Sequence, residues 1–147
     1  MRIPKSTLQY LAGIVDGEGC ICIERTKGRK KGHTLRHVIS LGVEMADREP
    51  LFLFKRWLGG YFKSRKRKSH YKRQYTWKIA ARKAVVALRA ILPYLRIKRK
   101  IKAARLCLAL ATSKKYQGRG QGVRVPAKII ARRERLHRQC RRLNRRG

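Results

Sequence analysis

The sequence predicts an α+β domain in which one antiparallel sheet carries helices on one face and leaves its other face open. Apolar residues alternate with period two over residues 19–24 and 35–46, and again over 61–67 and 71–79, which indicates two pairs of strands. Segments with helical spacing precede, separate and follow these pairs. The predicted order is therefore α-β-β-α-β-β-α, followed by further helices.

The first predicted helix carries an apolar stripe formed by Leu8, Leu11, Ala12 and Val15. Gly13 and Gly17 lie one turn apart in it and leave a notch. Since glycine costs about 1 kcal/mol relative to alanine inside a helix, the notch indicates the close approach of another backbone. A helix that frays at Gly17 is the alternative, and spacing alone does not separate the two.

Basic residues gather on both predicted hairpins, with almost no acid among them. In the second hairpin they share the face that the alternation leaves outside the core. Such a run is either a solvated face or a phosphate-binding surface, and its continuity over both hairpins favours phosphate binding. The candidate nucleic-acid-binding residues are Arg25, Arg29, Lys30, Lys31, Arg36, Ser40, Lys63, Arg65, Arg67, Lys72, Arg73, Gln74, Thr76 and Lys78.

The second half of the chain is predicted to be mainly helical. Asp47 can cap the helix that Gly59-Gly60 ends, and Pro93 breaks a helix over 81–95 before another over 97–113. Residues 1–113 are expected to form the core, and residues 114–125 a basic linker. Residues 126–147 are expected to form a basic amphipathic helix, which either belongs to the same domain or packs against a dimer.

The net charge of +34 on 147 residues far exceeds what solubility requires. A compact chain with this charge repels itself unless it binds a polyanion, for which DNA and RNA are the candidates. A membrane surface is the competitor, but no apolar run reaches the roughly 20 residues that span a bilayer, and the N-terminus makes a poor signal peptide. We expect an intracellular protein without a membrane partner, in a prokaryotic cytoplasm or an organelle matrix.

Two carboxylates, Asp16 and Glu18, stand among glycines at the end of the first helix, in a chain with only seven acids. Phosphodiester cleavage needs an activated water and a charge clamp, which a carboxylate-bound divalent metal supplies. Mg²⁺ is held by one or two carboxylates together with phosphates and water. Packing two copies of the helix through the Gly13/Gly17 notch would bring two Glu18 side chains together.

The stretch Leu11-Ala12-Gly13-Ile14-Val15-Asp16-Gly17-Glu18-Gly19 resembles the signature of the LAGLIDADG homing endonucleases, with Glu at the final acid. The resemblance covers about residues 6–113 and implies that family's αββαββα core, with a saddle-shaped sheet over the DNA major groove. It also implies a homodimer on a nearly palindromic site, because the chain carries one motif. The dimer interface would comprise Leu11, Ala12, Gly13, Asp16 and Gly17.

The resemblance further implies that Glu18 and the carbonyl oxygen of Gly17 bind Mg²⁺, for which Mn²⁺ or Ca²⁺ can substitute in binding. Asp47 and Lys98 would complete the catalytic site by ordering water and stabilising charge. We therefore expect a homodimeric, Mg²⁺-dependent, site-specific double-strand DNA endonuclease of the intron-homing type.

Other functions remain open at the level of sequence. A splicing cofactor that binds intron RNA and a non-cleaving DNA-binding regulator both suit the same fold. A ribosome-associated basic protein suits the composition, but such a protein has no use for Asp16, Glu18 and Asp47.

Overall fold

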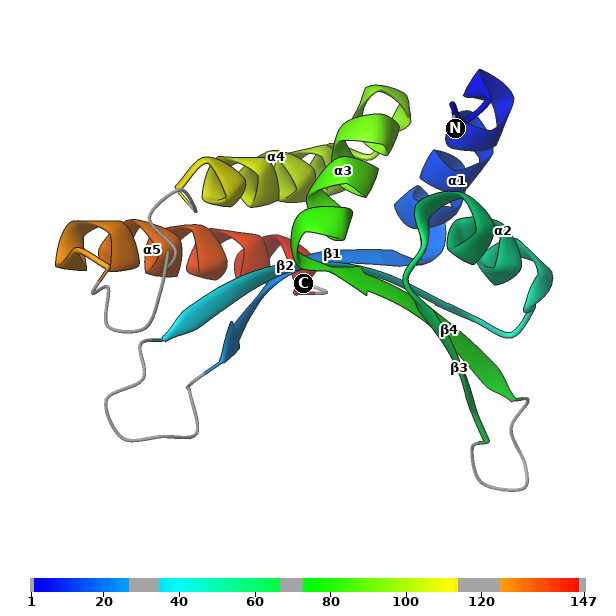
Figure 1. Ribbon diagram of the computed structural model, residues 1–147, viewed down its shortest axis with the longest axis horizontal. Coiled ribbons are helices and arrows are strands. Elements are labelled where there is room, and N and C mark those ends of the chain that lie inside the picture. Colours follow the sequence, from blue (N-terminus) through cyan, green and yellow to red (C-terminus); the bar gives the residue numbers. More distant parts are fainter. Residues whose placement is uncertain (1, 27–34, 67–72, 114–124, 146–147) are drawn as a thin grey trace.

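The computed structural model describes residues 2–26, 35–66, 73–113 and 125–145. Within these ranges the chain follows the predicted order of helices and strands, so the α+β fold class is confirmed (Figure 1). The elements are α1 (Lys5–Glu18), β1 (Gly19–Thr26), β2 (Arg36–Met45), α2 (Glu49–Leu58), β3 (Tyr61–Arg65), β4 (Gln74–Ala80), α3 (Ala81–Ile91), the 3-10 turn η1 (Leu92–Tyr94), α4 (Lys98–Ser113) and α5 (Ala127–Asn144).

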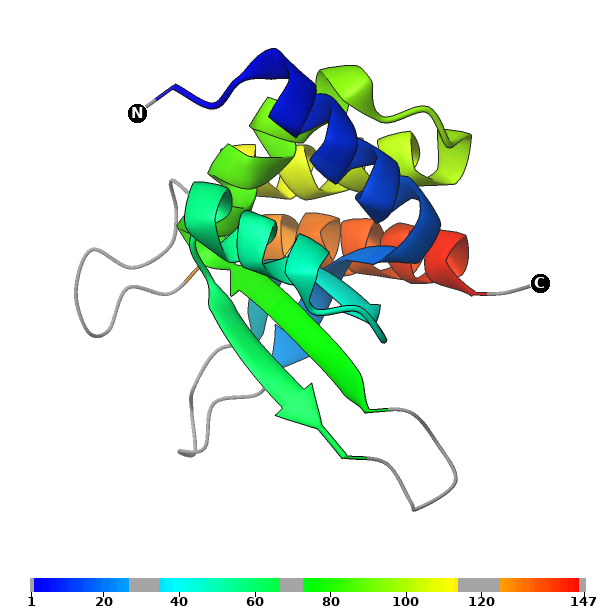
Figure 2. The same ribbon diagram turned by 90° about the vertical axis from the view of Figure 1, so that its right-hand side faces the viewer.

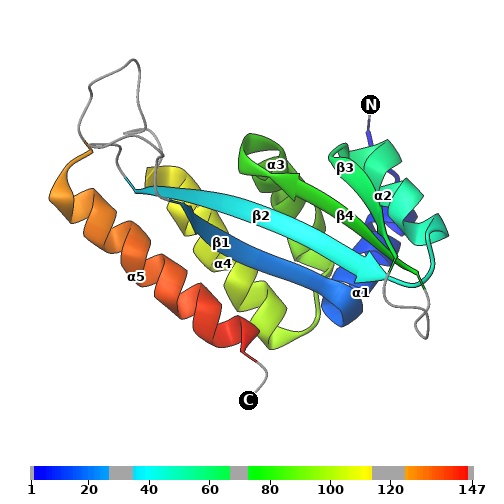
Figure 3. The ribbon, with the colours of Figure 1, turned by 90° about the horizontal axis from the view of Figure 1, so that it is seen from below.

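The strands form one antiparallel sheet in the order β1-β2-β4-β3. The sheet is arched, with helices α1 to α4 on its convex side and no helix across its concave side (Figures 1 and 3). The predicted open face is therefore present. In β1 and β2 the register pairs Gly19 with Val43 and Ile21 with Leu41, so the start of β1 lies beside the end of β2.

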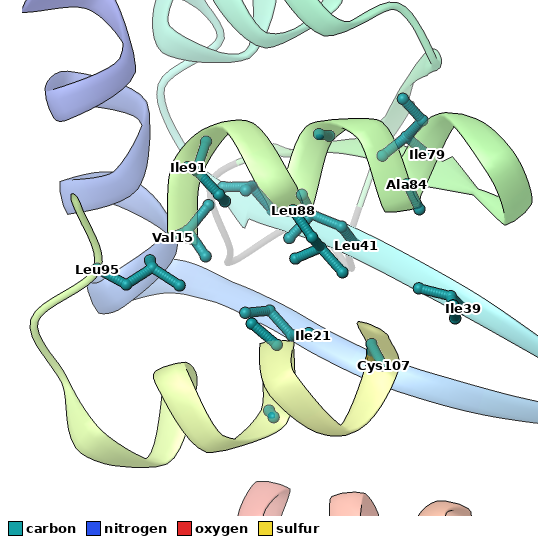
Figure 4. Packing of buried hydrophobic residues seen from close by; sticks show 14 of the residues in the cluster. Val15, Ile21, Ile39, Leu41, Ile79, Ala84, Leu88, Ile91, Leu95 and Cys107 are labelled. Atoms are coloured by element: carbon teal, nitrogen blue, oxygen red, sulfur yellow. The ribbon is translucent and has the colours of Figure 1, made fainter. Parts of the chain in front are cut away.

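The hydrophobic core lies between the helices and the convex face of the sheet. Ile21, Leu41 and Ile79 point from the strands toward Val15 of α1 and Leu88 of α3, and all five are at most 3% exposed (Figure 4). The period-two alternation explains this arrangement, because every second residue of a strand faces the same side. The residues between them are left to line the concave face.

Helix α5 packs along the free edge of β1, beside the sheet rather than above it (Figure 3). His137 Nδ1 lies 2.8 Å from the carbonyl oxygen of Ile23, and Asn144 Nδ2 donates to the carbonyl oxygen of Ile21 at 2.9 Å. These contacts satisfy edge groups that could otherwise pair with another chain. The buried face of α5 comprises Leu136, Cys140 and also Arg133, so its packing partner is this chain itself.

The helix cap predicted at Asp47 is absent. Asp47 does not cap α2, because the helix begins at Glu49 with Arg48 at the N-cap and no side-chain cap. The expected linker comprises residues 114–125. All of it except Val125 lies outside the described residues. Across the described ranges, no helix is long and apolar enough to cross a membrane.

Candidate nucleic-acid interface and active site

The concave face of the sheet holds a shallow groove of about 500 Å³. Its walls come from the outward-facing positions of β1, β2 and β4, as the alternation predicts. Glu18, the last residue of α1, lies against the groove at the end where β1 begins. The lining residues are Glu18, Cys20, Cys22, Glu24, Ser40, Gly42, Val43, Glu44, Gln74, Thr76 and Lys78.

Charge is unevenly distributed over this face. Lys63 and Arg65 of β3 lie opposite Thr76 and Gln74, share their face and are exposed. Arg36 and Arg73, at strand ends, are exposed too. Lys63, Arg65 and Arg36 stand on the open-face alternation, around a groove whose own lining is largely neutral or acidic. Phosphates would therefore find their partners around the groove, and base edges would meet its centre.

An ion pair between Lys78 and Glu24 lies at the centre of the groove. Lys78 Nζ bonds Glu24 Oε1, and this hydrogen bond raises the pKa of the lysine above its ordinary value. Lys78 is therefore partly neutralised, unlike Lys63 and Arg65. Ser40 is only 2% exposed, with its Oγ 3.5 Å from Cys22 Sγ, so it lies on the floor of the groove.

Arg25 lies apart from the other candidate nucleic-acid-binding residues. Its register opposite His37 places it on the helix-covered side of the sheet, where its Nε donates to Glu134 of α5 at 2.9 Å. Arg25 is therefore not one of the basic residues on the open face, and its side chain already forms an ion pair within the chain. The expected contacts at Arg29, Lys30, Lys31, Arg67 and Lys72 lie outside the described residues.

The three expected catalytic residues lie at one end of the sheet in the described fold. Glu18 ends α1, and Asp47 follows the end of β2, which the register places beside the start of β1. Lys98 begins α4, and all three side chains are exposed. Asp16 tethers α4 to α1, because its carboxylate accepts hydrogen bonds from the backbone N–H groups of Arg96 at 2.9 Å and Ile97 at 3.1 Å.

The junction between α1 and β1 is tightly built. A Cβ on Gly19 would lie 2.7 Å from Val15 backbone atoms, so only glycine fits there. Lys100 is 4% exposed, and its Nζ donates to the carbonyl oxygen of Gly19. Sequence reasoning missed Lys100, although its helical spacing with the buried Ala103, Ala104 and Cys107 places it on the inner face of α4.

Donors for a metal ion are few in one chain. Among the described residues, no group of three or more His, Cys, Asp and Glu side chains is arranged to hold a metal. Glu18 of α1 lines the groove with an exposed carboxylate, and Gly17, the residue before it, is exposed as well. This donor set fits Mg²⁺, which prefers oxygen ligands and takes much of its coordination from waters and phosphates.

Helix α1 lies on the outside of the helical layer (Figure 2). On its exposed side, Gln9 and Gly13 line a hollow together with Pro93, Tyr94, Leu95 and Arg96. Exposed residues follow each other along it at helical spacing: Ser6, Gln9, Gly13 and Gly17. A Cβ on either glycine would meet nothing within 4 Å. Leu11 and Ala12 are fully buried in the chain's own core and Asp16 is 8% exposed, so of the five expected interface residues Gly13 and Gly17 lie on this exposed stripe.

The described site is thus a carboxylate at the end of a groove on an open, cation-rimmed antiparallel sheet. No family model matches the sequence, and no curated protein matches it either. Solved structures match strongly. The homing endonuclease I-CvuI, in complex with its target in the presence of calcium, superposes with a TM-score of 0.74 at 21% identity, over 97% of this chain and 83% of that one.

Two further structures extend the comparison. The group I intron-encoded homing endonuclease I-CeuI, complexed with DNA, gives a TM-score of 0.71 at 15% identity, over 100% of this chain and 70% of that one. The LAGLIDADG homing endonuclease I-GzeII, in complex with a DNA target, gives 0.66 at 14% identity, over 88% of this chain and 43% of that one. The chain therefore has the LAGLIDADG homing endonuclease fold, and the likeness extends beyond residues 6–113 to α5.

Proposed function

We propose that the protein is a site-specific double-strand DNA endonuclease of the intron-homing type, active as a homodimer with Mg²⁺. The observation that carries the proposal is the position of Glu18. This exposed carboxylate stands at the end of the open-face groove, beside the exposed stripe of α1 formed by Ser6, Gln9, Gly13 and Gly17. An acid in this place is costly for DNA binding unless it holds a cation, because it faces phosphates.

In this proposal the stripe Ser6, Gln9, Gly13 and Gly17 packs against the same stripe of a second chain. Two small residues one turn apart allow two helix backbones to approach closely. A two-fold axis through α1 places two Glu18 carboxylates near each other and extends the two concave sheets to opposite sides. The target is then long and nearly palindromic.

Each side chain has a separate task. Lys63, Arg65, Arg36 and Arg73 hold phosphates, and the groove floor faces base edges. Glu18 and the Gly17 carbonyl oxygen would hold the metal, which supplies Lewis-acid stabilisation of the phosphate when bound. Asp47 orders water near the scissile phosphate, and Lys98 stabilises negative charge there.

Similar structures support the assignment of DNA as the partner, because I-CvuI, I-CeuI and I-GzeII were each solved with DNA. I-CvuI was also solved with magnesium on a target that was not cleaved. Binding and cleavage are therefore separable questions for this chain.

The test is incubation of the purified protein with a randomised DNA library and Mg²⁺, followed by sequencing of the ends produced. Paired cuts on both strands within a nearly symmetric sequence, lost with a chelator, are the expected result. Binding to DNA without cuts would instead define a non-cleaving regulator. Selective binding to intron RNA, with no DNA site selected, would define a splicing cofactor.

A further inference from the structure

Lys100 is a buried cation for which the proposed cleavage chemistry has no use. It lies on the inner face of α4, is 4% exposed and donates from Nζ to the carbonyl oxygen of Gly19. Burying an ammonium group costs several kcal/mol unless it is well paired. The contact with Gly19 is one of the interactions that offset this cost, and it ties the first turn of α4 to the junction of α1 and β1.

A second contact joins the same two segments in the opposite direction. The Asp16 carboxylate, on the last turn of α1, accepts hydrogen bonds from the backbone N–H groups of Arg96 and Ile97, just before α4. Lys100, on the first turn of α4, bonds Gly19, just after α1. Each segment thus contributes one charged side chain that holds the other segment's backbone.

The two contacts enclose the expected catalytic residues. Glu18 lies between Asp16 and Gly19 along the chain, and Lys98 lies between Ile97 and Lys100. Gly19 leaves no room for a side chain, so α1 and β1 meet closely at the point that Lys100 contacts. Because the two contacts hold these segments together, they also fix the position of Glu18 relative to Lys98.

We propose that Lys100 is a positioning residue that, together with Asp16, holds Glu18 in register with Lys98. The proposal rests on the proposed endonuclease function for its catalytic consequence, but its structural part stands on the contacts alone. Misplacing a catalytic group by about 1 Å can reduce a rate about a hundredfold, so a clamp of this kind has a measurable effect.

The first test is hydrogen exchange, which does not require cleavage. In Lys100→Met, faster exchange is expected at the Arg96 and Ile97 amides, which donate to Asp16 and which the clamp would couple to the Lys100 side chain. Lys102→Met, an exposed change on the same helix, should leave both amides unchanged. Unaltered exchange at Arg96 and Ile97 in a folded Lys100→Met would overturn the clamp.

The second test is single-turnover cleavage of a selected site as Mg²⁺ is varied. Lys100→Met is expected to lower the rate and to raise the half-saturating Mg²⁺ concentration, each about 10-fold to 100-fold. DNA affinity in Ca²⁺ should stay unchanged, and Lys100→Arg should recover part of the rate. If Lys100→Met has a lower melting temperature but a normal cleavage rate per folded molecule, Lys100 is only structural.

Lys100→Arg also decides the question if Lys100→Met does not fold. Its longer, planar head reproduces the Lys100 contact only in part, so cleavage below the wild-type rate at normal DNA affinity is expected. A wild-type rate and Mg²⁺ dependence would overturn the proposal. If the wild-type protein cleaves no DNA, the endonuclease proposal fails, while the exchange measurement still tests the clamp.

Discussion

Lys63 and Lys78 share the open face of the sheet but differ in their partners. Lys63 is exposed, whereas Lys78 is paired with Glu24 at the centre of the groove. A lysine that already has a carboxylate partner has less to gain from a phosphate, because binding must first break or share that pair. Residue type and strand face alone therefore overestimate how many of the predicted basic residues hold DNA.

This difference gives a prediction for the salt dependence of binding. Lys63→Ala and Arg65→Ala should each reduce the slope of log affinity against log salt concentration by about 0.9, the value for one lost phosphate contact. Lys78→Ala should change the slope less. The measurement is a DNA titration at several salt concentrations, and an unchanged slope for Lys63→Ala would place that residue in ordinary solvent.

A second residue-scale effect concerns His37, which is fully buried on the covered side of the sheet. Its Nε2 lies 2.7 Å from Glu134 Oε1, and its Nδ1 has no hydrogen-bond partner among the described residues. Burial lowers the pKa of His37 below its ordinary value of 6.5, against the opposing effect of Glu134; His137 and Arg133 also lower it. Arg25 completes the charged surroundings through its ion pair with Glu134.

Because the folded pKa is lowered, the stability that His37 contributes is complete above its unfolded pKa and is lost as pH falls through the folded pKa. The melting temperature should therefore fall between about pH 7 and about pH 5, where unperturbed histidine titrates. His37→Gln should show a shallower fall. An equal pH dependence in the two proteins would contradict this account of His37.

At the scale of elements, α5 is held by polar contacts as well as by its apolar stripe. Arg133 is 1% exposed and donates to Ser113 Oγ at 3.2 Å and to the Ser113 carbonyl oxygen at 2.9 Å, at the end of α4. The cation also lies where a helix dipole is negative. Arg133 therefore ties the two C-terminal helices together.

We predict that Arg133→Ala destabilises the fold by about 2–4 kcal/mol, because it removes buried packing and leaves a buried carbonyl oxygen unpaired. Arg132→Ala, at the adjacent exposed position, should stay within about 0.5 kcal/mol of wild type. Chemical denaturation measures both. Equal losses for the two variants would show that Arg133 is no more important than a surface arginine.

The same elements show what the sequence predicts well. Alternation in β1, β2 and β4 identified the groove-lining positions, and helical spacing located α3 and α4, because both patterns are local consequences of chain geometry. Arg25 with Glu134, Arg133 with Ser113 and Lys100 with Gly19 were not predictable in this way. Each joins segments distant in sequence, and nothing local distinguishes these cations from their many exposed neighbours.

For the whole molecule, the main expectation is a homodimer, and this expectation depends on the glycines of α1. Within one chain, Gly13 and Gly17 have no reason to be glycine, since a Cβ on either would enter open space. Alanine would even favour the helix by about 1 kcal/mol. The partner helix of the proposed homodimer would supply the missing reason, and the sequence alone did not separate this interpretation from a fraying helix end.

Gly13→Leu should therefore convert a homodimer into a monomer without loss of helical circular dichroism. Sedimentation equilibrium across a range of protein concentrations measures the change, with Lys83→Leu on the exposed side of α3 as the control. A Gly13→Leu protein that dimerises as well as wild type would remove the α1 stripe from the interface.

The most direct test of the proposed site is the pair of variants Glu18→Gln and Glu44→Gln, both at carboxylates that line the same groove. On a selected DNA site with Mg²⁺, Glu18→Gln should lose cleavage by more than about a hundredfold, which exceeds the usual effect of residues one step from a metal. Its DNA affinity in Ca²⁺ should be equal or higher, and Glu44→Gln at saturating protein should still cleave. Cleavage by Glu18→Gln at the wild-type rate would contradict the account.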